Sequence, residues 1–389
     1  MPTSLKTLST HSPALDTLLE KHRAFWRRDA KGFLRAVSVF APSEPSRLPQ
    51  RDGRAITQAA RLTPDMFDVG LLIDDVLAWD PSQNDPLLAA RQQVLAFPGV
   101  GDLLPLSRAF FKIPWLEAML GCPITMTEGQ IWVGHYEGTA EDAIRRGVHF
   151  EGNPWFQLYV EFLHQLQARL EPRYLASANT LLRGTCDLVA AILGVKEACV
   201  GWIEQPRLMA RLLRVCTDAN LAVIEAGRKA LRPFQGGYMS AFGVWAPEYV
   251  VRTQADHSTL LSPRMYREQI LPFDREVIAA APHCIFHIHN NGYHIAPDLV
   301  QVPELDAIEV VVDPYPTGAR KAYEIVMMQM ILQHKALLID GNFPSYEEAE
   351  WVLAQLDRRG LYYNVQLSAE TLSALPEGAP HSEMWLLEE

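Results

Sequence analysis

Cysteine is scarce in this sequence, and the residues that occur form no recognisable framework. The five are Cys122, Cys186, Cys199, Cys216 and Cys284. Their number is odd, they are scattered, and no two have Cys-x-x-Cys spacing, so neither a zinc ribbon nor a disulfide scaffold is predicted. Such usage is typical of a protein in a reducing compartment, and we expect a cytoplasmic location.

Long apolar runs and an excess of basic residues are also missing. No segment approaches the roughly 20 uninterrupted apolar residues that span a bilayer, and residues 1–13 lack the apolar core of a secretory signal. The formal net charge is −11, whereas a surface that binds nucleic acid is basic. We therefore expect neither a membrane nor a nucleic-acid partner, and a small molecule is the expected ligand.

Three common catalytic and cofactor motifs are absent as well. The sequence contains no Walker-type phosphate loop, no Gly-x-Gly-x-x-Gly dinucleotide fingerprint and no Gly-x-Ser-x-Gly nucleophile elbow. The chemistry must therefore be sought in the arrangement of strands and in the residues at their ends.

An alternation of strand-like and helical segments is present along most of the chain. Hydrophobic residues make up 48% of the 389 residues, enough for a large core. A helix is expected at 14–29 and strands near 34–40, 122–127, 173–178, 237–242, 283–289, 307–313, 336–341 and 361–366. Amphipathic helices are expected at 155–171, 181–193, 205–231, 263–281, 319–334 and 345–359. About eight such strands is the number that a (β/α)8 barrel requires.

The predicted architecture is therefore α/β, a TIM-type (β/α)8 barrel with an N-terminal helical extension. We expect one domain over residues 1–389. Residues 1–120 would form N-terminal helices, the first strand and long loops, and residues 121–389 the rest of the barrel. Alternation of this kind favours a parallel sheet with crossover helices.

Polar residues stand at nearly every predicted strand end, where barrels of this type keep their chemistry. His289-Asn290-Asn291-Gly292, which follows the apolar run Cys284-Ile285-Phe286, is the most informative example. The other candidates are Ser177, Asn179, Ser240, Asp256, Asp313, Asp340, Asn342, Asn364 and Gln366. For each of them, a turn or a helix cap is the alternative role. Trp115, Trp132, Trp155 and Trp245 are candidates to line a pocket, with a place in the core as the alternative.

His287 and His289 face the same side if the segment is a strand, since side chains alternate. Such a pair holds a metal when carboxylates join it, and Asp256, Glu309 and Asp340 are the candidates. We favour a core role for His287 and a functional role for His289. Asp256 is expected to orient substrate or to accept a proton near His289.

Residues Asp256–Pro272, which read DHSTLLSPRMYREQILP, resemble the uroporphyrinogen decarboxylase superfamily. In that superfamily the next strand ends in His-x-Cys-Gly or His-x-Asp-Gly, where this chain has His289-Asn290-Asn291-Gly292. Ile339-Asp340-Gly341-Asn342 also resembles its penultimate strand end. The resemblance covers about residues 150–366 and implies a (β/α)8 barrel with its site at the carboxyl-terminal mouth.

Two departures from the superfamily bear on the reaction. The decarboxylases carry an Arg-rich N-terminal signature, whereas only the scattered Arg51, Arg54 and Arg61 occur here. The zinc methyltransferases use His-x-Cys and a second cysteine near the last strand, but Asn291 takes the first cysteine position and residues 361–366 contain none. The cofactor therefore stays open: zinc with His289 as a ligand is one hypothesis, although the usual cysteine ligands are absent.

Three functions follow, with the first slightly favoured. The chain transfers a methyl or other one-carbon group on a small molecule, it is a metal-free decarboxylase or lyase, or it is a non-catalytic barrel that binds a ligand or a corrinoid partner. His289, Asp256 and Asn291 are the predicted catalytic residues. The predicted substrate-binding residues are Ser240, Asn179, Asp340, Asn342 and Trp115. By analogy with the superfamily, a corrinoid protein is a candidate partner and a homodimer is expected.

Overall fold

A computed structural model describes most of the chain. It covers residues 13–39, 48–56, 59–78, 99–102, 106–108, 113–147, 150–170, 175–177 and 182–367. Within these residues, no helix is long and apolar enough to cross a membrane.

Six parallel strands form the centre of the fold. They are β10 (Val250–Gln254), β11 (His283–His289), β12 (Ala307–Val312), β13 (Ala336–Asn342), β14 (Leu361–Leu367) and β1 (Leu34–Val39), neighbours in that order. A short strand, β3 (Gly99–Gly101), pairs antiparallel with the outer edge of β1. The carboxyl ends of the six strands therefore meet at one edge of the sheet, where loops can bring their side chains together.

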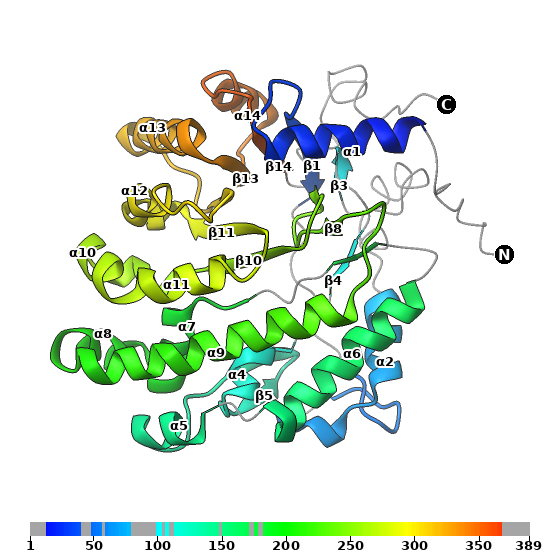
Figure 1. Cartoon of the computed structure of the whole chain (residues 1–389), viewed down its shortest axis with the longest axis vertical. Helices are drawn as coiled ribbons and strands as arrows, with labels where there is room; N and C mark the ends of the chain where they lie inside the picture. Colours follow the sequence, from blue (N-terminus) through cyan, green and yellow to red (C-terminus); the bar gives the residue numbers. More distant parts are fainter. Residues whose placement is uncertain are drawn as a thin grey trace.

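Helices connect successive strands and cover one side of the sheet. Figure 1 shows them following one another along this side: α11 (Leu271–Ile278), α12 (Ala296–Leu299), α13 (Gly318–His334) and α14 (Tyr346–Leu353). Two of these helical segments begin at a serine whose side chain caps the first turn. Ser345, for example, caps α14 by accepting a hydrogen bond from the backbone N–H of Glu348. Ser262 caps the short α10 (Pro263–Met265) in the same way, and a π-helical turn (Tyr266–Ile270) joins it to α11.

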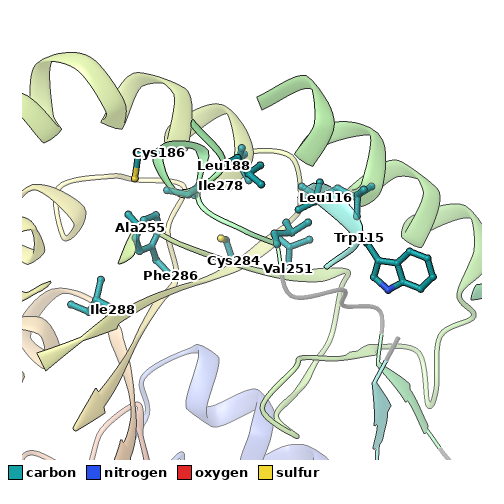
Figure 2. Close-up of a cluster of buried hydrophobic side chains, with 14 of the residues drawn as sticks. Trp115, Leu116, Cys186, Leu188, Val251, Ala255, Ile278, Cys284, Phe286 and Ile288 are labelled. Atoms are coloured by element: carbon teal, nitrogen blue, oxygen red, sulfur yellow. The ribbon is translucent and has the colours of Figure 1, made fainter. Parts of the chain in front are cut away.

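The two faces of the parallel sheet differ in what they bury. Alternate residues of β11 (Cys284, Phe286 and Ile288) lie in the large core between the sheet and the helices, as Figure 2 shows. The intervening Ile285 belongs to a second apolar cluster on the opposite face. Because side chains alternate along a strand, His287 and His289 share this second face with Ile285. The second face therefore changes from apolar to polar toward the carboxyl ends of the strands.

The rest of the described chain packs around this sheet. The helices α6 (Pro154–Leu170), α7 (Thr185–Leu193), α8 (Val195–Glu204) and the long α9 (Pro206–Ala230) pack on one another. Helix α1 (Pro13–Trp26) lies against β1, as Figure 1 shows, and it also contacts β9. Smaller elements are α2 (Val69–Ala78), α4 (Trp115–Met119), α5 (Ala140–Arg146), β4 (Leu106–Arg108), β7 (Leu175–Ser177), β8 (Tyr238–Met239) and β9 (Trp245–Ala246). Strands β4, β7, β8 and β9 form a second, four-stranded sheet.

The α/β class is confirmed, and each of the eight predicted segments contains a strand, with two corrections to the arrangement. The segment predicted at 122–127 does form a strand, β5 (Ile124–Thr127), but it pairs antiparallel with β2 (Ala60–Leu62) and β6 (Gln130–Val133). It therefore lies outside the parallel sheet. Conversely, β10 was not predicted. Among the described residues the strand pairs do not close into a ring, since β7 pairs with β8 rather than with β10.

Candidate functional site

Asp256, His287 and His289 converge at the carboxyl end of β10 and β11. Asp256 opens a 3₁₀ turn (Asp256–Leu260) just after β10, and the histidines lie on one face of β11. One potential ligand atom of each residue lies within 4.8 Å of the other two. The Nε2 atoms of His287 and His289 lie 3.7 Å and 4.0 Å from Oδ1 of Asp256. The sequence offered Asp256 as one of three candidate carboxylates for the histidine pair, and the structure places Asp256 beside both rings.

The second ring nitrogen of His287 is held by a buried carboxylate. Glu309 on β12 stands opposite His287 in the strand register, and its Oε2 contacts Nδ1 of the imidazole. Burial lowers the pKa of His287 well below its usual range, and the nearby Arg252 acts in the same direction. A neutral ring that donates from Nδ1 to the carboxylate of Glu309 directs the lone pair of Nε2 toward Asp256.

The two oxygens of Asp256 have different surroundings. Oδ2 accepts a hydrogen bond of 2.6 Å from the amide of Gln254 and lies 3.7 Å from Nη1 of Arg183. Oδ1 is shielded from solvent, yet it accepts no hydrogen bond from any residue that the structure describes. Buried carboxylate oxygens are rarely left without a donor or a cation. Oδ1 and the Nε2 atom of His287 are thus two acceptors that face one another.

Asp187 anchors the turn that carries Asp256. Its carboxylate, in the first turn of α7, accepts hydrogen bonds from the amide of Gln254 (2.8 Å) and the backbone N–H of His257 (2.7 Å). Burial raises the pKa of Asp187, but Arg183 and these hydrogen bonds outweigh it, so the pKa is below its ordinary value. The amide of Gln254 therefore bridges two carboxylates and fixes which oxygen of Asp256 faces the histidines.

Two arginines flank the site in different ways. The side chain of Arg183 is 41% exposed, and its Nε lies 3.2 Å from a carboxylate oxygen of Glu117 on α4. Arg252 is buried on β10, where its guanidinium contacts Gln254 and lies 5.9 Å above the ring of Phe242. Burial lowers the pKa of Arg252, while Glu309 and Asp256 act against this shift. Arg183 is therefore the arginine with a solvent-facing surface.

The charge of this network is predominantly negative. Its two guanidinium groups, those of Arg183 and Arg252, face a larger number of carboxylates, namely Glu117, Asp187, Asp256 and Glu309. Buried like charges are costly unless a counter-charge is close. A divalent cation between Asp256 and the two histidines would supply such a charge.

The residues fit a bound transition metal. Two imidazole nitrogens and one carboxylate oxygen make a ligand set used by catalytic zinc, with a fourth position left for substrate or water. The same set with open positions also occurs in non-haem iron enzymes. Ligands on one tetrahedral zinc lie about 3.3 Å apart, slightly closer than the 3.7 Å and 4.0 Å found here. A carboxylate behind a metal-binding histidine, as Glu309 stands behind His287, is the usual outer support.

Two further predicted residues lie on the same face of the sheet. Asp340 on β13 accepts hydrogen bonds from the amides of Asn364 (2.8 Å) and Gln366 (2.5 Å) on β14. Asn342 follows two residues later and lies opposite Gln366 in the strand register. These residues form a second polar group at the carboxyl ends of the strands, separated from His289 by β12.

The structure places Ser240 in a turn and Trp115 in the core. The hydroxyl oxygen of Ser240, buried between β8 and β9, accepts hydrogen bonds from the backbone N–H groups of Phe242 (3.3 Å) and Val244 (3.2 Å). It therefore supports a turn, the alternative that the sequence left open. Trp115 is buried at the start of α4, with its ring 5.4 Å from that of Tyr159, and belongs to the core.

The structure gives no support for a role of the predicted residues Asn291 and Asn179. Asn291 is exposed in the 3₁₀ turn Asn290–Ile295 that follows β11. Its buried neighbour Asn290 instead donates a hydrogen bond of 2.9 Å to the backbone oxygen of Pro314. Asn179 lies outside the described residues. Neither Asn290 nor Asn291 belongs to the cluster around Asp256.

Sequence reasoning missed Asp187, Arg183, Arg252 and Gln254. The only local signal was the spacing of Arg252, Gln254 and Asp256, which places alternate polar residues on one side of an extended segment. Nothing in the sequence links this segment to Asp187, which lies nearly 70 residues earlier in the chain. The support of the site is therefore visible only in three dimensions.

Comparisons with known proteins show the fold and no more. No protein-family model and no curated protein matches the sequence. Among solved structures, a methyltransferase from Methanosarcina mazei is similar with a TM-score of 0.51 and 16% identity, over 91% of this chain and 94% of that one. A homocysteine methyltransferase from Escherichia coli, in metallated form, aligns with a TM-score of 0.23 and 12% identity, over 63% of this chain and 91% of that one. The second alignment is too weak to support an argument. The first shows a fold shared along nearly the whole chain.

Proposed function

We propose that this chain is a metal-dependent enzyme that transfers a methyl or other one-carbon group on a small molecule. The observation that carries the proposal is the convergence of Asp256, His287 and His289 around a buried carboxylate oxygen that has no donor among the described residues. The fold shared with a methyltransferase supports the choice of reaction. The superfamily resemblance of residues Asp256–Pro272 supports the same choice.

Zinc fits the ligand set best for this reaction. When bound, it would supply a Lewis acid that lowers the pKa of a thiol or water in its open position. Asp256, His287 and His289 would hold it, and His289, whose side chain is 37% exposed, borders the solvent side. Gln254 orients the carboxylate of Asp256, and Arg183 offsets part of the negative charge.

The proposed architecture is a closed (β/α)8 barrel. Strands β4 and β7 are parallel to one another, and they are the candidates for the two members that the six-stranded sheet lacks between β1 and β10. The polar group of Asp340, Asn342 and Gln366 would then face the cluster of Asp256 across the mouth. This placement supports a substrate-binding role for Asp340 and Asn342. A corrinoid partner and a homodimer stay predictions.

Methyl transfer from a free corrinoid to a thiol tests the proposal. In this reaction the S–C bond forms as the Co–C bond breaks, the bonding electron pair stays on cobalt, and the thiol proton is released. We expect zinc-loaded protein to demethylate methylcobalamin in the presence of one thiol of a small panel, followed by absorbance, and His289→Ala to lose this activity. A rate equal to that of the metal-free protein for every thiol would overturn the proposal.

Decarboxylation is the second candidate, and Arg183 is the observation that favours it. A decarboxylase needs a cation to bind the substrate carboxylate, and the partly exposed guanidinium of Arg183 lies beside Asp256. Release of carbon dioxide from a panel of carboxylated substrates, lost in Arg183→Gln, would favour this reaction. No release from any of them, together with thiol methylation, would leave methyl transfer alone.

A further inference from the structure

Glu309 is a fully buried carboxylate on a strand that is otherwise apolar. It lies in β12 among Ala307, Val310 and Val312, all buried. A buried charge is costly, and a well-packed hydrophobic residue at such a position is often neutral or stabilising. Stability alone therefore does not account for a carboxylate here, and its contact with His287 is the feature to explain.

The contact of Glu309 with His287 determines which ring nitrogen is available. A neutral imidazole has one N–H and one lone pair. Since the carboxylate of Glu309 accepts at Nδ1, the proton belongs there, and Nε2 keeps its lone pair. Consistent with this assignment, Nε2 makes no hydrogen bond to Oδ1 of Asp256, which lies 3.7 Å away. In the opposite tautomer, Nε2–H would be a donor and could not bind a metal.

We propose that Glu309 is the positioning residue of the metal site, and that it makes His287 a ligand by fixing the proton on Nδ1 and the plane of the ring. The inference rests on the proposed metal site. Glu309 does not itself reach the metal position, because His287 stands between them. Outer carboxylates of this kind orient the imidazole and make it more basic, and their loss typically costs 10–100-fold in metal affinity.

The substitution Glu309→Gln tests this role, with Asp274→Asn as a matched control. Both replace a fully buried carboxylate by an amide, but Asp274 contacts Thr185 and Tyr266 rather than a ligand. Zinc affinity is measured by competition with a chromophoric chelator, the ligand geometry by the visible spectrum of bound Co²⁺, and folding by circular dichroism. We expect Glu309→Gln to bind zinc about 10–100-fold more weakly with an altered Co²⁺ spectrum, and Asp274→Asn to match wild type in both.

The outcomes separate this inference from the proposed function. If wild type binds zinc and Glu309→Gln binds it equally tightly with the same Co²⁺ spectrum, Glu309 is only structural and the inference is wrong. If wild type binds neither zinc nor Co²⁺, the proposed metal-dependent function fails instead.

A measurement on the wild-type protein covers the case in which Glu309→Gln does not fold. The chain has 12 histidines, and NMR of protein with ¹⁵N-labelled histidines shows which nitrogen of each neutral ring is protonated. The signal that is missing in His287→Gln belongs to His287. Metal-free wild type is expected to show Nδ1–H and an unprotonated Nε2 at His287. An Nε2–H tautomer would overturn the inference whether or not a metal binds.

Discussion

The Nε2 atom of His287 lies 3.7 Å from Oδ1 of Asp256, with no hydrogen bond between them. Each atom offers a lone pair, because Glu309 occupies the other side of the imidazole and Gln254 donates to the other oxygen of Asp256. Two acceptors held face to face by buried neighbours are costly in the absence of a cation. The arrangement is therefore understandable as a site prepared for a metal at some expense of stability.

Asp256→Asn should weaken metal binding and stabilise the metal-free protein. The amide can donate to Nε2 of His287, so the two facing acceptors become a hydrogen-bonded pair worth about 1 kcal/mol, while an anionic ligand is lost. Thermal unfolding with and without zinc checks both effects. The free energy of unfolding of wild type should rise by about 2.7 kcal/mol at a zinc concentration 100 times the dissociation constant. That of the variant should rise little. A variant that is less stable without metal and equally stabilised by zinc would contradict the account.

Gln254→Leu should loosen the turn that carries Asp256. The variant keeps the approximate volume but removes the amide that donates to both Asp187 and Asp256. The buried carboxylate of Asp187 then loses a donor, at about 1–3 kcal/mol of unfolding free energy, and the half-buried carboxylate of Asp256 loses another. Because Asp256 can also rotate, zinc affinity should fall about tenfold. Urea unfolding and chelator competition measure the two effects. A change in stability without any change in zinc affinity would show that Gln254 has no part in orienting Asp256.

Asp274→Asn should alter how stability depends on pH. Burial raises the pKa of Asp274 from 3.8 to about 7 in the folded protein, although the hydroxyls of Thr185 and Tyr266 oppose the shift. The group stays protonated when folded and ionises when unfolded between about pH 4 and pH 7, so stability falls as pH rises through this window. The effect is on the order of 4 kcal/mol.

Urea unfolding across this pH window compares wild type with Asp274→Asn. The amide at position 274 cannot ionise. The free energy of unfolding of the variant should therefore fall less than that of wild type from about pH 4 to pH 7, and the variant should be relatively more stable at the upper end. Identical slopes for the two proteins would mean that Asp274 does not titrate with a raised pKa. Burial lowers the pKa of His22 to about 4, so this residue makes the free energy of unfolding rise with pH, opposite to Asp274. His22 is the same in both proteins, and its contribution cancels when they are compared.

The strands were predictable where their side chains follow a simple pattern, and not elsewhere. The seven residues of β11 are mostly apolar, and both the strand and its polar end were predicted. Strand β10 was missed because Arg252, Thr253 and Gln254 are polar, although all three are buried. Their burial depends on partners from other parts of the chain, such as Asp187 for Gln254. The run at 122–127 was correctly a strand, but its antiparallel pairing depends on its neighbours, which a local pattern does not specify.

The site was predictable as a set of residues but not as an arrangement. His289 and Asp256 were singled out from their positions at strand ends, and both belong to the cluster. His287 was expected to be a core histidine. Its Nδ1 fits that expectation, because it contacts the buried Glu309. Its second nitrogen, Nε2, faces Asp256 and belongs to the site. The turn role of Ser240 and the core position of Trp115 were alternatives that the sequence could not decide.

The metal content of the tag-free protein tests the central claim most directly. Wild type, His289→Ala and Asp256→Asn are equilibrated with zinc, dialysed and examined by elemental analysis. The account predicts about one zinc per wild-type chain and substantial loss from both variants, because each removes one of three protein ligands. Wild type without zinc, or one zinc per chain retained in both variants, would contradict it.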